Sequence, residues 1–123
     1  MNSRIEREAA QTAFRVSELQ KRIQVLEATR EDLERQIRKL TDSVPEDDID
    51  ANAQKEGYVA YGSYAKSVIA RKANLRASLA DIVAQTGDLA GELRAATDVL
   101  DSFERIRARE AATKAEEAVR KAG

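Results

Sequence analysis

The chain has 123 residues, and its 21 Lys and Arg against 22 Asp and Glu give a net charge of -1. Of the apolar residues 22 are Ala, which leaves 30 large apolar side chains, too few for a compact globule of this length. The sequence has no His and no Cys, so the usual zinc, haem and iron–sulfur ligand sets, Cys nucleophiles and His bases are absent. We therefore expect neither an enzyme nor a cofactor.

The charge pattern and the apolar runs also argue against two kinds of partner. Residues 1–40 mix nine basic with seven acidic residues, unlike the dense basic block of a nucleic-acid-binding helix. No apolar run approaches the roughly 18 residues of a membrane span, and the first residues lack the apolar region of a signal peptide. We expect a soluble, intracellular protein with no nucleic-acid partner and no membrane insertion.

A first helix is predicted over residues 3–43. Large apolar residues there recur at alternating steps of four and three, with Thr12 and Arg30 as polar interruptions. A period of 3.5 held over five heptads is typical of a helix that packs along a partner helix in a left-handed supercoil. The apolar seam consists of Ile5, Ala9, Val16, Leu19, Ile23, Leu26, Leu33, Ile37, Leu40 and Val44.

The pattern fails over about 44–60, where the only Pro of the chain, Pro45, predicts a turn region. Within it, residues 48–52 match the start of an EF-hand calcium loop. The positions of that loop that require Gly and Glu hold Ala53 and Val59, so we favour a solvated acidic turn over a calcium site.

A second helix is predicted over about 61–120, with Lys72 and Thr86 as polar interruptions. Gly87 and Gly91 lie inside it and weaken its middle by about 1 kcal/mol each relative to Ala, without ending it. Its seam consists of Tyr61, Ala65, Val68, Leu75, Leu79, Ile82, Leu89, Leu93, Ala96, Leu100 and Phe103.

Two complementary seams on one chain predict an all-α fold, in which two long helices form an antiparallel coiled-coil hairpin, as a single domain over 1–123. We expect such a chain to be monomeric alone, and a parallel dimer is the alternative. A fold-back centred near residue 52 would set Ile37 level with Val68 and Ile5 level with Leu100. The helix past about Phe103 would then overhang, as a bare extension of about 20 residues.

Three basic residues, Arg30, Lys72 and Arg107, occupy seam positions. Each is expected to run its stem along the seam with its charge in water, or to fix the register as a buried polar residue. A basic contact for a partner is the alternative.

The aromatic residues are candidates for contacts with a partner. Tyr58, Tyr61 and Tyr64 follow helical spacing at the start of the second helix, where they either plug the end of the coiled coil or form a docking surface. Phe14, at an outward position, and Phe103, near the end of the seam, are candidate exposed apolar contacts.

Two segments of the second helix carry a resemblance to a known family. They are residues 61–75, YGSYAKSVIARKANL, and residues 99–109, VLDSFERIRAR, with Leu79, Ile82 and Leu89 between them. An aromatic pair, a long heptad run and a Glu/Arg-rich end in this order resemble the second helix of the flagellar export protein FliJ family. The first helix is similar to that family in size and pattern.

The resemblance implies a non-enzymatic, stalk-like component of the flagellar type III protein export apparatus, which serves flagellum biogenesis and motility. It would lie in the cytoplasm, peripheral to the inner membrane, and link the export ATPase ring to the cytoplasmic domain of the export gate and to export chaperones. The gate-contacting face would begin at Tyr64, Val68 and Leu75 with Tyr61 beside it, and the ring-contacting end would include Phe103, Ile106 and Arg109. A structural coiled-coil adaptor or oligomerisation protein without an export role is the alternative.

Overall fold

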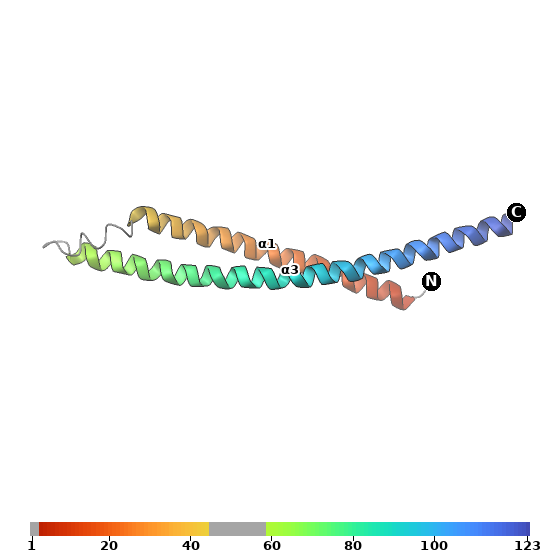
Figure 1. The fold of residues 1–123 in the computed structure, drawn as a ribbon, viewed down its shortest axis with the longest axis horizontal. Coiled ribbons are helices and arrows are strands. Elements are labelled where there is room, and N and C mark those ends of the chain that lie inside the picture. Colours follow the sequence, from red (N-terminus) through yellow and green to blue (C-terminus); the bar gives the residue numbers. More distant parts are fainter. Residues whose placement is uncertain (1–2, 45–58) are drawn as a thin grey trace. The chain divides into compact units, whose positions relative to one another are not determined.

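The computed structural model describes residues 3–44 and 59–123, which contain two α-helices and no strand (Figure 1). Helix α1 spans Ser3–Ser43 and helix α3 spans Val59–Ala122, drawn from red to yellow and from green to blue. The predicted all-α fold, with two long helices packed against each other, is confirmed. The expected turn region is described only at its edges, and Tyr58 and residues 48–52 lie outside the described residues.

The end of α1 follows from the sequence around Pro45. The last turn of α1 is extended by a backbone hydrogen bond of 3.1 Å from the Val44 amide to the Leu40 carbonyl. The residue before a proline is sterically disfavoured in the helical region, so Val44 is a poor continuation of the helix. In α3 no proline follows, and the helix continues through Gly87 and Gly91 as predicted.

Both predicted seams form the buried stripe of their helix. Every seam position whose side chain is described is buried or partly buried, from Ile5 to Val44 in α1 and from Ala65 to Phe103 in α3. The polar interruptions Thr12 and Thr86 are accommodated because their hydroxyls donate to carbonyls one turn back, at 2.8 Å each. Their polar groups are thereby satisfied within their own helix, so these seam positions do not leave an unpaired hydroxyl.

The chain divides into two compact units, and the first comprises residues 1–23 and 88–123. Within it the start of α1 packs against the second half of α3 in the opposite direction, since Glu6 pairs with Arg107 and Arg15 pairs with Glu92. The Arg15–Glu92 distance is 3.1 Å, with both side chains about half exposed. The buried residues of this unit are Ala9, Leu19, Leu89 and Ala96.

The second unit comprises residues 24–87. Its apolar core lies where the end of α1 meets the start of α3, in a cluster of Val44, Ala65 and Val68 with Leu40 packed against it. Lys72 follows one turn later in α3 and is 1% exposed, the one charged residue that is buried in the described parts of the chain. The end of α1 lies beside the start of α3, so the two helices are antiparallel here as well (Figure 1).

The predicted register was wrong by an amount that differs between contacts: Arg15 would lie level with Ala90 and pairs with Glu92, two residues away, whereas Glu6 departs by eight residues. In the predicted register Glu6 would lie level with Val99, but it pairs with Arg107, and Val68 packs beside Leu40 and Val44 instead of at the level of Ile37. A seam that repeats every three or four residues fits several registers almost equally well. The choice depends on individual contacts, which the period does not encode.

Candidate interaction surfaces

Arg107 joins the start of α1 to α3. Its Nε donates to Glu6 Oε1 at 3.1 Å and its Nη2 donates to Glu6 Oε2 at 2.8 Å, a bidentate pair across the two helices. Its Nη1 also donates to Glu104 Oε1 at 3.0 Å, one turn back in α3. The hydrogen bond to Glu6, with the negative charges of Glu6 and Glu104, raises the pKa of Arg107, although desolvation opposes the shift. Arg107 is therefore charged at any physiological pH.

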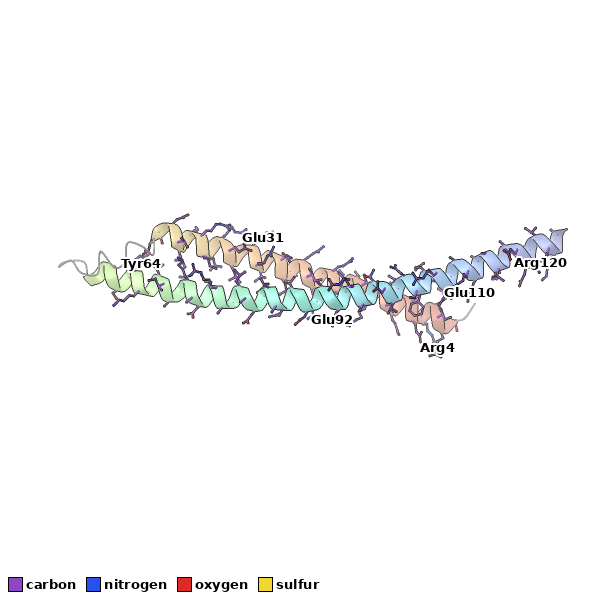
Figure 2. The ribbon with its side chains drawn as sticks, viewed as in Figure 1. Arg4, Glu31, Tyr64, Glu92, Glu110 and Arg120 are labelled. Atoms are coloured by element: carbon purple, nitrogen blue, oxygen red, sulfur yellow. The ribbon has the colours of Figure 1, made fainter. Side chains whose placement is uncertain are left out.

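Beyond Glu110, the described end of α3 is exposed along its whole length. Residues 111–123 are all exposed, whereas Phe103, Ile106, Arg107 and Glu110 are partly buried. The predicted bare extension therefore exists, but it begins at residue 111 instead of about residue 103. Glu110 and Arg120 mark this segment in Figure 2. We call residues 111–122 the C-terminal extension.

The two sides of the C-terminal extension differ in chemistry. The seam spacing continues into it, but the seam positions now hold charges of alternating sign, namely Glu110, Lys114, Glu117 and Lys121. At helical spacing this is a series of i, i+3 and i, i+4 pairs of opposite charge, which favour an isolated helix. The side away from the seam carries small apolar residues, namely Ala108, Ala111, Ala112, Ala115, Ala118, Val119 and Ala122.

A shallow groove of about 570 Å³ lies along the start of the extension. Its described lining comes from α3 and consists of Ile106, Arg107, Arg109, Glu110, Ala111, Thr113, Lys114 and Glu117. Within it, Glu110 Oε2 is shielded from solvent and has no hydrogen-bond partner among the described residues. Because this oxygen is shielded, a partner could reach it only if the Glu110 side chain turned; the accessible charges of the groove are those of Arg109, Lys114 and Glu117.

The candidate gate-contacting residues have different environments. Tyr64 is 55% exposed, Leu75 is partly buried in the seam, and Val68 is only 5% exposed. Val68 therefore belongs to the core of its unit and does not present its side chain to a partner. The backbone of Tyr61 is helical, but its side chain lies outside the described parts of the structure.

The candidate ring-contacting residues lie in the other unit. Phe103 and Ile106 are partly buried, so Phe103 is a seam residue more than the exposed contact that was expected. Arg109 is exposed, and it lines the same groove as Ile106. Phe14 is 68% exposed on the outward side of α1, as its heptad position predicted.

Glu6 and Glu110 were not recognised from the sequence. Glu6 directly follows the seam residue Ile5, and such flanking positions commonly form ion pairs between coiled-coil helices. The heptad position of Glu6 could therefore be read from the sequence, but the register that pairs Glu6 with Arg107 could not. Glu110 stands at a seam position, where its charge marks the end of the apolar seam.

The charged seam residue Arg30 forms ion pairs within its own helix. Its Nη2 lies 3.0 Å from Glu27 Oε2 and its Nε lies 3.4 Å from Glu34 Oε1, both on α1. These partners one turn away on either side hold the head of Arg30 near solvent, with its side chain 43% exposed. The charge of Arg30 is thus paired locally, but its Nε is shielded from solvent and makes no hydrogen bond among the described residues, so only part of the guanidinium follows the expected arrangement.

No group of three or more acidic side chains in residues 3–44 and 59–123 is placed to hold a metal ion. Neither described helix has a stretch long and apolar enough to cross a membrane.

Comparison of the chain with models of protein families, with curated proteins and with solved structures gives no match.

Proposed function

We propose that this protein is a non-enzymatic component of the flagellar type III protein export apparatus. It acts as a stalk-like coiled coil that links the export ATPase to the export gate and to export chaperones. In this role it lies in the cytoplasm, peripheral to the inner membrane at the export apparatus. Two features support the proposal: the helical hairpin, and the residue pattern of α3 that resembles the FliJ family.

The observation that carries the proposal is the C-terminal extension. It continues α3 past the last paired residues as a helix that is exposed on all sides. An exposed single helix fits a ring opening or a groove of another protein, because its whole circumference is available for contact. The groove at its base adds an apolar contact at Ile106 and the exposed charges of Arg109 and Glu117. We assign the ATPase contact to this end.

We assign the gate contact to the side of α3 that carries Tyr64. Tyr64 is more than half exposed, and it is not part of the apolar cluster of Val44, Ala65 and Val68 in the described core. For Tyr64 this favours the docking interpretation over a plug in the coiled coil. A tyrosine combines a large apolar ring with a polar hydroxyl and is enriched at interfaces. Val68 supports this side from beneath, as a core residue.

A binding experiment with two partners tests both assignments. The export ATPase and the cytoplasmic domain of the export gate, from the same organism as this chain, are each immobilised. They are then probed with the full chain, with a chain that ends at Glu110, and with Tyr64→Ala. We expect loss of residues 111–123 to abolish ATPase binding and to spare gate binding. Tyr64→Ala should weaken gate binding only.

Phe14→Ala is a matched control, because it removes an exposed aromatic side chain of the other helix. The proposal is wrong if the folded full chain binds neither partner, and if deletion of its gene leaves swimming and flagellin export intact. Circular dichroism of each variant establishes that the helices are intact before binding is compared.

A further inference from the structure

The outward side of α1 carries a second regular row of residues, separate from its seam. Each position lies two residues after a seam position, and two residues turn a helix by about 200°, so this row points away from α3. All of these residues are exposed except Glu18, which is partly buried. We call this row the outer face of α1, and it consists of Arg7, Gln11, Phe14, Glu18, Lys21, Val25, Ala28 and Asp32.

The outer face holds both of the large apolar side chains that α1 exposes. Phe14 is 68% exposed and Val25 is 65% exposed. They are eleven residues apart, close to three helical turns, so they lie in line along the helix. Single exposed apolar residues are common on protein surfaces and need no explanation. Two of them in line on a row that repeats with the period of the seam indicate a surface that packs against another helix.

The order of charges along the outer face indicates what covers it. From the two ends toward the middle, Arg7 corresponds to Asp32 and Glu18 corresponds to Lys21. Both of these pairs are centred between residues 19 and 20, and so is the pair of exposed apolar residues. Each member of a charged pair has the sign opposite to that of the other. A row with this symmetry is complementary to itself when two copies of the helix run in opposite directions.

The charges of the outer face are accessible for such a contact. Arg7 takes part in no ion pair within the described parts of the chain. Lys21 Nζ lies 3.5 Å from Glu18 Oε1, with side chains 69% and 46% exposed. Asp32 Oδ1 likewise lies 3.5 Å from Arg35 Nη2, with both side chains more than half exposed. Exposed pairs of this kind contribute little to stability, so their charges can also serve a contact between chains.

We propose that the outer face of α1 binds the same face of a second copy of this chain, antiparallel, with the two-fold axis between residues 19 and 20. Phe14 then packs against Val25 of the partner subunit, and Glu18 lies beside Lys21 of the partner subunit. Each of these contacts occurs twice. A parallel pair would instead set Lys21 against Lys21 of the partner subunit, and like charges in contact are unfavourable.

One pair of like charges flanks this arrangement, and the interface is short. Arg15 comes near Arg22 of the partner subunit, but Glu92 of its own chain lies 3.1 Å from Arg15 and neutralises it. Because one helix of each chain supplies the whole contact, it buries less than a standard protein interface, and the dimer is weak. The protein is then a pair of hairpins at high concentration, where the seams alone led us to expect a monomer.

Sedimentation equilibrium of the full chain from about 10 µM to 1 mM tests the association. We expect the mass to rise from 13.6 kDa toward twice that value. Phe14→Ala should raise the dissociation constant at least about tenfold, because the lost contact occurs twice. Val83→Ala is the control that should leave it unchanged, since Val83 is an exposed apolar residue of α3. A monomer over the whole range, or an equal effect of both variants, would overturn the proposal.

Charge reversal tests the antiparallel orientation. Lys21→Glu sets acidic residues of the two chains against each other near the axis, and we expect a monomer over the same range of concentration. Lys21→Glu combined with Glu18→Lys restores opposite charges both within α1 and between the chains, so the dimer should return. Circular dichroism establishes that both variants keep their helices. Absence of rescue by the double reversal would rule out this orientation.

Mixed disulfides test the register, and the sequence has no cysteine to interfere. Residues 11 and 28 are opposite each other in the proposed dimer, since they too are centred between residues 19 and 20. When Gln11→Cys and Ala28→Cys chains are mixed in a thiol–disulfide buffer, the mixed dimer should predominate over both symmetric ones. Symmetric dimers in excess, or a random distribution, would show that the register is wrong.

These results are independent of the ATPase and gate contacts, which are assigned to residues 111–122 and to the side of Tyr64. Binding to those two partners is measured well below the concentrations at which the chain associates. Phe14→Ala is therefore a suitable control for that binding, because the chain is then a monomer.

Discussion

Arg30 and Arg107 occupy equivalent positions in the heptads of the two helices, yet they do different things. Arg30 forms ion pairs with Glu27 and Glu34, which lie about one turn before and after it on the same helix. Arg107 reaches across to Glu6 of the other helix with two hydrogen bonds. Only the second contact depends on which residues of the two helices lie side by side. A charged seam residue therefore fixes a register only where its partner lies on the facing helix.

Removal of the Arg107 contact should weaken the pairing of residues 3–23 with 88–110. We expect Arg107→Ala to lower the melting temperature by a small amount at low ionic strength, and 1 M salt should nearly abolish the difference. Arg105→Ala is the control, since Arg105 is exposed and bonds only to Ser102 on its own helix. Because the pKa of Arg107 is raised, the arginine is fully charged at neutral pH, and on the alkaline side the pair is lost once strongly alkaline solution deprotonates it. An equal fall in melting temperature for both variants would show that the Glu6–Arg107 pair adds no stability beyond that of an exposed arginine.

Alanine substitutions at Val68 and Tyr64 distinguish a core residue from a surface residue by their effect on stability. Val68→Ala removes two buried methyl groups beside Val44 and Ala65, so the free energy of unfolding should fall by about 1–2 kcal/mol. Tyr64→Ala removes a side chain that is 55% exposed and should change stability much less. Chemical denaturation of the two variants measures both values. A larger loss for Tyr64→Ala would place the tyrosine in the core and remove it from the gate contact.

At the scale of the helix, Gly87 lowers the stability of α3, and no contact within the described residues requires a glycine at this position. An added Cβ at this position would have no heavy atom within 4 Å, so alanine fits without a clash. Alanine is favoured over glycine in a helix by about 0.5–1 kcal/mol. We expect Gly87→Ala to raise the unfolding free energy by about that amount, measured by thermal melting. Ala84→Gly, the reverse change one turn earlier, should lower it, and a destabilising Gly87→Ala would indicate a close contact of that helix face.

The helices themselves could be predicted from the sequence because their cause is periodic. An apolar residue every 3.5 positions specifies a helix, its buried side and its need for a second helix, and every described seam residue follows the pattern. Polar interruptions such as Thr12 did not break it, since a threonine hydroxyl can bond to its own helix. The bounds of α3 differ from the expected ones by two residues at each end.

The register and the candidate site could not be predicted equally well, because they depend on single contacts. The pairing of Glu6 with Arg107 extends the paired region of α3 to Glu110, and the bare extension is shorter than the period alone suggested. Likewise Val68 looked like a contact residue in the family pattern, but its neighbours Val44 and Ala65 bury it. Ala65 is a local neighbour, but Val44 follows α1 and lies 24 residues earlier in the sequence, so a local pattern does not identify it.

For the molecule as a whole, the C-terminal extension should be dispensable for folding. Residues 111–123 are exposed, so a chain that ends at Glu110 should melt within a few degrees of the full chain, with its helical signal reduced in proportion to the residues removed. Circular dichroism melts of both forms measure this. A much lower melting temperature for the shorter chain would mean that the extension stabilises the paired helices. A chain that ends at Leu100 is the contrasting control, because it also removes Arg107 and the last seam residues.

The alternation of charge along one side of the extension restricts how any other molecule can approach it. Covering Glu110, Lys114, Glu117 and Lys121 would strip water from four ionic groups, and each desolvation is costly unless an opposite charge replaces the water. The alanine and Val119 side carries no such cost. A partner that covers the charged side, as at the groove, must therefore bring matching opposite charges, whereas an apolar surface suffices on the alanine side, and this difference sets the angular orientation in which the segment enters a binding partner.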